Sequence, residues 1–176
     1  GIFLPHRRFE DVVVAVRLLV DVGLDPTLSI IGDYGNDKKY HAQVVQAIKD
    51  NRVEDRVRLL GRVSEDDLIQ NYNEHDLYLF PHHWQSDGLS PFEAAATGLP
   101  ILISRTAGSH ELLKNGETGM VIEAKNPADI AAKVRRIIED PALYTRLSEG
   151  GNAFVRANLS WQKYTDQMLA VFTEVL

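Results

Sequence analysis

Short apolar runs alternate with longer amphipathic segments along most of this chain. The runs expected to form strands cover residues 1–4, 27–32, 57–61, 77–80, 101–104 and 120–122. The segments with helical periodicity cover residues 9–22, 37–51, 64–72, 109–113, 127–138, 141–158 and 160–176, and a further short helix begins near Ser90. Strands that alternate with helices in this way favour a parallel sheet with helices on both faces.

The order of these elements predicts an α/β protein with a Rossmann-like, doubly wound parallel sheet of about six strands. In such a sheet, ligands bind beyond the carboxyl ends of the strands. Three loops leave those ends with polar residues, at positions 5–8, 32–35 and 82–88. We therefore expect the functional residues in these loops. The last helix, 160–176, has a wide apolar face, and we expect this face to be exposed in the isolated chain and to drive dimerisation.

Composition is that of an ordinary water-soluble globular protein and narrows the choice of partners. Hydrophobic residues make up 44% and charged residues 25% of the 176 positions. The net charge of -6 and the lack of a basic block argue against binding to nucleic acid. There is no cysteine for disulfides or thiolate metal sites, and no apolar run is long enough to cross a membrane. Because the sequence starts at Gly1 rather than Met, we expect it to be a fragment of a longer chain.

The stretch 82–100 connects two predicted strands through a polar loop and the start of a helix. Ser90 suits the N-cap, Pro91 suits the first helical position, and Glu93 follows three residues after Ser90. The N–H groups and the dipole of a helix N-terminus favour a phosphate, and Gly88 would let the backbone approach it closely. Alternatively, this pattern is a capping box in which Glu93 only bonds back to the N–H of Ser90.

Other polar residues near these strand ends could complete a binding site. Arg7 and Arg8 could hold a phosphate between their rigid forks of donors, although such a pair is also common on a solvated helix turn. A carboxylate such as Glu93 can accept hydrogen bonds from a ribose diol. The adjacent His82 and His83 should point in opposite directions, so a shared metal ion is not expected, and we expect one to be structural and the other to face the cleft.

Several motifs in sequence order resemble one known family. Gln85 and Glu93, separated by seven residues and followed by 94–101, resemble the Glu-x7-Glu signature of retaining GT-B glycosyltransferases of the group 1 (family 4) type. Weaker matches follow that family's order at residues 3–9, 30–33, 60–64, 108–111 and 115–119. The resemblance extends over nearly the whole chain, and motifs in the right order are far more specific together than any one of them.

The resemblance implies that this chain is one half of a GT-B fold. Such enzymes have two Rossmann-like domains, and the active site lies between them. This chain is similar to the C-terminal, donor-binding domain, so residues 1–176 would be a single nucleotide-sugar-binding domain with C-terminal helices at 127–176. The acceptor-binding N-terminal domain is not part of this sequence and would be its partner. The isolated half is therefore expected to bind a donor without transferring sugar.

The resemblance also assigns roles to individual residues. Arg7 stands at the family's diphosphate-binding lysine, and the backbone N–H groups of Gly88, Leu89 and Ser90 would contact the diphosphate or the sugar. Glu93 would bind the ribose. The base would lie against two apolar residues, Val63 and Leu68. Neither a metal ion nor another cofactor is expected.

Two departures from the family pattern concern the proposed chemistry. Gln85 replaces the first glutamate of the signature, and an amide cannot serve as a carboxylate nucleophile or base, although it can bond a sugar hydroxyl. No nucleophile is needed if the acceptor attacks on the face that the leaving phosphate vacates. Ile2 stands where the family usually has a second arginine, and Arg8 is a candidate to replace it.

The motifs leave the donor and the pathway open. GDP-mannose and UDP-glucose are both compatible with the resemblance, which implies hexosyl or mannosyl transfer to a surface glycan or glycolipid. The implied location is the cytoplasm, with peripheral association of the full-length enzyme with the inner face of the membrane. The main alternative is a Rossmann-like regulatory or interaction domain with a degenerate nucleotide-sugar site. An epimerase-like GT-B enzyme is a third hypothesis, which the 85–100 stretch fits less well.

Overall fold

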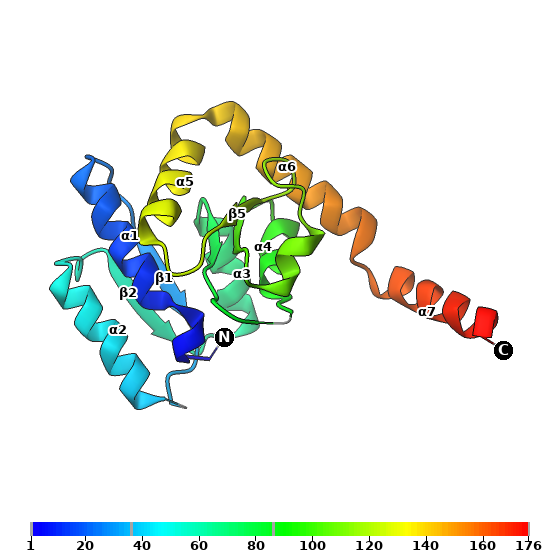
Figure 1. The fold of residues 1–176 in the computed structure, drawn as a ribbon, viewed down its shortest axis with the longest axis horizontal. Helices are drawn as coiled ribbons and strands as arrows, with labels where there is room; N and C mark the ends of the chain where they lie inside the picture. The colour runs from blue at the N-terminus through cyan, green and yellow to red at the C-terminus, as the bar shows by residue number, and fades with distance from the viewer. Residues whose placement is uncertain (1, 36, 86, 176) are drawn as a thin grey trace.

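The structure is a computed structural model that describes residues 2–35, 37–85 and 87–175. Parts of three sequence predictions therefore lie outside the described residues: Gly1 of the first strand, Ser86 of the 82–88 loop and Leu176 of the last helix. Figure 1 shows a compact body of helices and strands, from which the C-terminal helix projects.

The helices lie where the sequence periodicity predicts them. Seven α-helices occur within the described ranges: α1 (Phe9–Asp21), α2 (Lys38–Asp50), α3 (Glu65–Glu74), α4 (Ser90–Ala96), α5 (Pro127–Glu139), α6 (Pro141–Asn158) and α7 (Trp161–Val175). Two short 3-10 helices, η1 (Pro5–Arg7) and η2 (Gly108–Leu112), complete the set. The predicted cap of α3 is confirmed, because the Ser64 hydroxyl accepts a hydrogen bond from the N–H of Asp67 at 3.1 Å.

The α/β class with parallel pairing is confirmed, but the described strands form two sheets. The strands are β1 (Leu28–Ile31), β2 (Val57–Gly61), β3 (Tyr78–Phe80), β4 (Ile101–Ser104) and β5 (Met120–Ile122). β1 pairs with β2, and β3, β4 and β5 follow one another in the second sheet. The predicted first strand is reduced to a parallel bridge between Ile2 and Asp33, because η1 begins at Pro5. The expected six strands are therefore five within the described residues.

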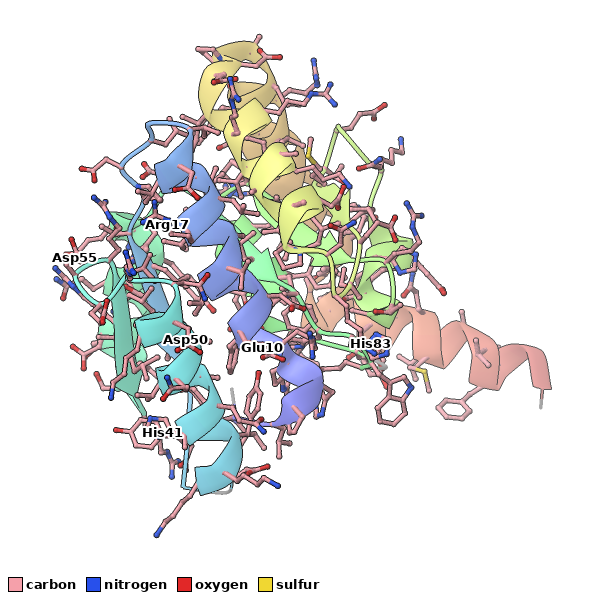
Figure 2. The ribbon with its side chains drawn as sticks, turned by 60° about the vertical axis from the view of Figure 1, so that its left-hand side comes forward. Glu10, Arg17, His41, Asp50, Asp55 and His83 are labelled. Carbon is pink, nitrogen blue, oxygen red and sulfur yellow. The ribbon has the colours of Figure 1, made fainter. Side chains whose placement is uncertain are left out.

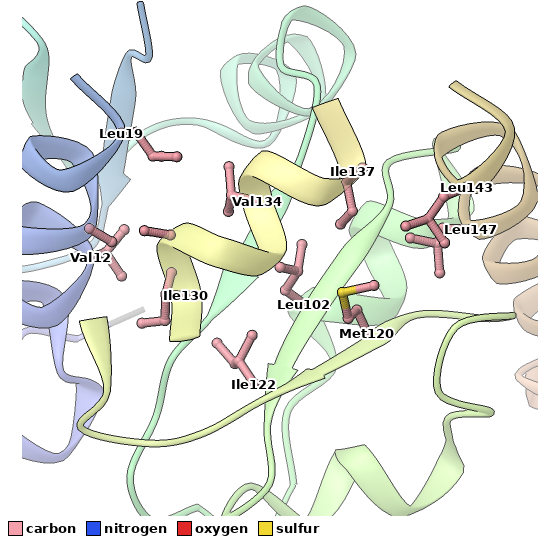
Figure 3. Close-up of a cluster of buried hydrophobic side chains, with 12 residues drawn as sticks. Val12, Leu19, Leu102, Met120, Ile122, Ile130, Val134, Ile137, Leu143 and Leu147 are labelled. Atoms are coloured by element: carbon pink, nitrogen blue, oxygen red, sulfur yellow. The ribbon is translucent and has the colours of Figure 1, made fainter. Parts of the chain in front are cut away.

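Helix α1 holds the two sheets together through two adjacent faces. Val12 and Leu19 pack into a cluster that includes apolar residues of β4, β5, α5 and α6, as Figure 3 shows. Val13 and Val16, also fully buried on α1, pack instead on β1 and α2. Because α1 contributes to both clusters, it fixes the carboxyl ends of both sheets at the same side of the molecule.

Helix α7 has few contacts with the body and exposes a broad apolar surface (Figure 1). Trp161 is 83% exposed and Phe172 is 57% exposed, so the expected exposure of this face is confirmed. The dimerisation that we expect from this face stays a prediction. Across the described part of the chain, no helix combines the length and the hydrophobicity needed to cross a membrane.

Candidate functional site

The 3-10 helix η1 and the loop that follows β3 meet at the carboxyl ends of the strands. The N–H of His83 donates to the carbonyl of His6 at 2.8 Å, which joins this loop directly to η1. The N–H of Gly108 donates to the carbonyl of Gln85 at 2.9 Å and connects the same loop to η2. Figure 2 shows His83 at the same end of the molecule as Glu10, in the first turn of α1. This end of the molecule gathers most of the residues that the sequence analysis selected.

Arg7 is a half-buried guanidinium that pairs with no carboxylate of the described residues. Its Nη1 lies 3.0 Å from Nδ1 of His82 and donates to Oε1 of Gln85. Its Nε is buried and has no hydrogen-bond partner among the described residues. Burial lowers the pKa of Arg7, which shows that the charged form loses hydration here. An anion would supply the compensation that neutral partners cannot.

The imidazole of His82 is buried, with 5% of the residue exposed, and it packs on Phe80 at a ring separation of 3.7 Å. Burial, followed by the charge of Arg7, lowers the pKa of His82 to about 3. The ring is therefore neutral at physiological pH, with one donor nitrogen and one acceptor nitrogen. Nδ1 can donate to Oε1 of Gln85 at 2.7 Å, which leaves Nε2, 3.5 Å from Nη1 of Arg7, as the acceptor. In this tautomer the closer contact, between Nδ1 and Nη1 of Arg7 at 3.0 Å, brings two donor groups together.

Gln85 uses both ends of its side-chain amide in this network. Its Oε1 accepts from Arg7 and His82, and its Nε2 donates to the carbonyl of Asp87. The amide holds Arg7 in place and leaves its positive charge uncompensated, whereas a carboxylate at this position would neutralise it. Of the two adjacent histidines, His82 belongs to this network, while the buried Nδ1 of His83 finds no partner in the described part of the chain.

Arg8 does not join Arg7 in a converging pair. Its Nε and Nη2 donate to the carboxylate of Asp11 at 2.8 and 2.7 Å, and its Nη1 pairs with Glu10 at 2.7 Å. These bonds raise the pKa of Arg8 and fasten it to the first turn of α1, where acidic residues are favoured. The expected converging pair of arginines is not formed in this structure, because two carboxylates already neutralise Arg8, and binding of the donor by Arg8 stays a prediction.

The start of α4 differs from the sequence prediction. Leu89 occupies the N-cap position, and Ser90 is the first helical residue. The hydroxyl of Ser90 accepts from the Tyr78 hydroxyl at 2.8 Å, and burial raises the pKa of Tyr78 to about 12, so this donor stays protonated. The N–H of Glu93 donates to the carbonyl of Leu89 at 3.0 Å. The Ser90 cap and the capping-box alternative are therefore both wrong.

Packing within the protein alone requires a glycine at position 88. A Cβ at this position would lie 2.4 Å from Cζ of Phe80, far inside van der Waals contact. The same phenylalanine ring packs on His82 at an interplanar angle of 45°, so Gly88, Phe80 and His82 form one packed unit. Among the described residues, no acceptor takes a hydrogen bond from the N–H of Leu89 or Ser90. Within the described residues, these two N–H groups are open at the start of α4.

One cavity of about 1460 Å³ connects most of the selected side chains. Its lining includes Arg7, Val63, Leu68, Ser90 and Glu93. The structure thus brings together residues that are up to 86 positions apart, the separation of Arg7 and Glu93.

Glu93 and the exposed residues define the rim of the site. The carboxylate of Glu93 is exposed, and its Oε2 accepts from the Tyr72 hydroxyl at 3.3 Å. Trp84 and Leu89 are 75% and 73% exposed and do not line the cavity. The described ranges contain no cluster of histidine and carboxylate residues that could hold a metal ion. The roles of Tyr72, Tyr78 and Phe80 were not predicted from the sequence, because the residues that they contact on α4 and in the loop before it are set by the tertiary fold.

Comparison with protein families gives one match over most of the chain. Residues 1–154 match the family model described as glycosyl transferases group 1. The glycogen synthase of Mycobacterium tuberculosis (strain H37Rv) is 28% identical over 157 residues, which are 89% of this chain and 37% of that protein. The D-inositol 3-phosphate glycosyltransferase of Thermomonospora curvata is 31% identical over 180 residues, which are 98% of this chain and 41% of that protein. The chain thus spans less than half the length of these curated relatives.

Solved structures give the same fold at low sequence identity. Alr3699/HepE of Anabaena, solved with UDP and glucose, matches with a TM-score of 0.88 and 19% identity over 99% of this chain and 47% of that one. The C-terminal domain of the group 1 family protein LpcC of Francisella tularensis matches with a TM-score of 0.83 and 19% identity over 92% of this chain and 84% of that one. These likenesses support the Rossmann-like fold of a GT-B domain.

Proposed function

We propose that this chain, which belongs to the group 1 glycosyltransferases, binds a nucleotide-diphospho-sugar and forms the donor half of a retaining enzyme. The observation that carries the proposal is Arg7, a half-buried cation with only neutral partners at a cavity that Glu93 also lines. A diphosphate supplies the missing negative charge, and a guanidinium matches its geometry. The solved complex of Alr3699/HepE with UDP and glucose supports this class of donor.

The other parts of the donor follow from the same cavity. The N–H groups of Leu89 and Ser90, together with that of Gly88, face the diphosphate or the sugar. The exposed carboxylate of Glu93 accepts hydrogen bonds from the ribose diol, with the Tyr72 hydroxyl as its support. Val63 and Leu68 provide the apolar surface for the base. UDP-glucose and GDP-mannose are the two donors that we propose to compare.

The proposed chemistry uses no protein nucleophile. The bond between the anomeric carbon and the diphosphate oxygen breaks, and the acceptor oxygen bonds to the same face of the sugar. The acceptor proton passes to the leaving phosphate. Arg7 stabilises the charge that develops on that phosphate, and Gln85 holds Arg7 in position without neutralising it. The acceptor would be bound by an N-terminal domain, so this half alone binds a donor and transfers no sugar.

Calorimetric titration with UDP, GDP, ADP and their sugar conjugates tests the proposal, without and with Mg²⁺. We expect one base to bind in the absence of metal. Arg7→Ala should weaken that binding by about 10- to 150-fold, since a hydrogen bond to a charged group contributes about 1.5–3 kcal/mol. Arg105→Ala, which removes an exposed arginine paired with Glu123, is the matched control and should bind normally. Equal affinity of Arg7→Ala and the parent would refute the diphosphate assignment.

A regulatory or interaction domain with a degenerate site is the second candidate. The observation in its favour is that Arg8 is neutralised by two carboxylates, while Ile2 stands at the position of the family's second arginine. Of the two adjacent arginines, only Arg7 would then remain free of carboxylate partners among the described residues for the two phosphates. Failure of all nucleotides to bind, both here and in the full-length protein, would support this candidate.

A further inference from the structure

A tyrosine of β3 reaches the first residue of α4 at the proposed donor site. The Tyr78 hydroxyl donates to Oγ of Ser90 at 2.8 Å, across 12 positions of the chain. Both residues line the cavity that Arg7 and Glu93 also line. The proposed function uses the backbone N–H of Ser90, so it assigns no role to these two hydroxyl groups.

Tyr78 is held close to both charged residues of the site. Burial is the largest cause that raises the pKa of Tyr78, and the charges of Glu93 and Arg7 act on it in opposite directions. Its ring packs against a buried cluster of α4 and β4 side chains and lies edge-on to the ring of Tyr72, with centroids 6.0 Å apart. The phenol is therefore fixed beside the side chains that we assign to the donor.

The direction of the bond decides what the serine hydroxyl can do. A hydroxyl group has one O–H donor and two acceptor lone pairs. Because the hydrogen of Tyr78 occupies a lone pair of Ser90, the serine keeps its own hydrogen for another partner. Glu93 is three positions further on, but among the described residues its carboxylate accepts from Tyr72 and not from Ser90. The oxygen of Ser90 is thus fixed while its hydrogen is still free to be donated.

Such a donor suits a phosphate oxygen. Ser90 is partly exposed and lines the cavity, so an anion bound there can reach its hydroxyl. Donation from Tyr78 polarises the serine O–H, which strengthens the next hydrogen bond in the chain. It also restricts rotation of the serine side chain, which lowers the entropic cost of binding. A serine without this neighbour has neither advantage.

We infer that Tyr78 is a positioning residue for the diphosphate, because it aligns the Ser90 hydroxyl to donate to a phosphate oxygen of the nucleotide-sugar. This inference rests on the proposed function and adds an aligned side-chain donor to it. Arg7 supplies the positive charge, and Ser90 supplies a neutral hydrogen bond. Since the leaving phosphate gains negative charge as the bond to the anomeric carbon breaks, this hydrogen bond strengthens in the transition state.

Packing is the alternative role of the same bond. Tyr78 and Ser90 would then only join β3 to α4, and the nucleotide would not contact the serine hydroxyl. This role predicts that Tyr78→Phe lowers stability without a selective loss of affinity for ligands that carry phosphate groups.

Calorimetric titration with UDP, GDP and inorganic diphosphate separates the two roles. The parent is compared with Ser90→Ala, Tyr78→Phe and the double variant. For each diphosphate that the parent binds, Ser90→Ala should weaken binding by about 10- to 150-fold, as expected for a hydrogen bond to a charged acceptor. Tyr78→Phe keeps the ring and should weaken binding by about 2- to 10-fold. In the double variant the loss of the Tyr78 hydroxyl should add nothing, because the group that it aligns is absent.

Three controls separate alignment from a general loss of folding. Uridine and guanosine lack the diphosphate, so their affinities should be equal in the parent and all variants. Ser90→Thr keeps a hydroxyl and should retain most of the diphosphate affinity. Tyr40→Phe removes a different tyrosine hydroxyl, which donates to Glu10, and should lower the melting temperature without changing diphosphate affinity.

The possible results distinguish this inference from the proposed function. Weaker binding by Arg7→Ala but normal binding by Ser90→Ala would keep the diphosphate site and overturn the role of the serine hydroxyl. An equal effect of Tyr78→Phe in the parent and in Ser90→Ala would show that Tyr78 acts independently of Ser90, against the inference. Equal weakening of nucleosides and diphosphates would assign the effect to folding. Failure of the parent to bind any of the three diphosphates would overturn the proposed function and this inference together.

Discussion

His82 should make this protein less stable in mild acid, and its replacement should remove that loss. The imidazole is buried against Phe80 and lies beside the guanidinium of Arg7. Burial, followed by the charge of Arg7, lowers the pKa of His82 from the ordinary 6.5 to about 3. A proton added to the ring in the folded state would place two positive charges next to each other in a poorly hydrated site. His82→Gln keeps hydrogen-bonding groups there but cannot titrate in this range.

The sign and the size of the effect follow from proton linkage. The pKa is lower in the folded state, so the unfolded chain binds the proton first as the pH falls. The contribution of neutral His82 to stability is therefore complete above pH 6.5 and is lost progressively towards pH 3. One pKa unit corresponds to about 1.4 kcal/mol, so the loss between pH 7.5 and pH 5 is about 2 kcal/mol.

Urea denaturation of the parent and His82→Gln at pH 7.5, 6.5, 5.5 and 5.0 tests this reasoning. The difference in free energy of unfolding between the two proteins should be constant above pH 6.5 and should shift by about 2 kcal/mol at pH 5. Other titrating groups cancel in this difference, because both proteins contain them. Arg7→Met in the parent, which removes the second cause of the low pKa, should reduce the loss only below about pH 4, where the folded-state pKa limits it. A difference that stays constant from pH 7.5 to 5 would refute the burial argument.

Three further substitutions separate ligand binding from packing. Gln85→Glu should pair with Arg7 and lower nucleoside diphosphate affinity by about tenfold in calorimetry, and unchanged affinity would contradict the role of the uncompensated charge. Gly88→Ala should lower the free energy of unfolding by about 1–3 kcal/mol in urea, because the new methyl meets Phe80, and Phe80→Leu should restore part of it. Arg8→Ala should lower the free energy of unfolding by about 1–3 kcal/mol, because it leaves the buried carboxylate of Asp11 unpaired. Nucleotide affinity should stay unchanged, and weaker binding would show that Arg8 takes part in binding the nucleotide.

The sequence by itself determined the elements and the class of fold. Helical periodicity located α1 and α5, and apolar runs located β2 and β4. Both patterns are visible in the sequence, because the buried positions of one helix or strand are close together along the chain and are apolar. The cap of α3 at Ser64 was also readable, since an N-cap bond reaches only three residues along the chain. The ordered motifs led to the family, which the match over residues 1–154 confirms.

Only the tertiary structure decided which partners each candidate residue contacts. Arg7 and Arg8 are equivalent in sequence, but one meets neutral partners 75 and 78 residues away while the other is neutralised by its own helix. The local sequence pattern predicted Ser90 as an N-cap. In the structure the Ser90 hydroxyl instead accepts a hydrogen bond from the Tyr78 hydroxyl, because β3 lies against the start of α4. Sequence patterns such as an N-cap describe only interactions between residues a few positions apart in the chain. Which strand lies beside which loop sets the partners, the burial and therefore the charge at this site.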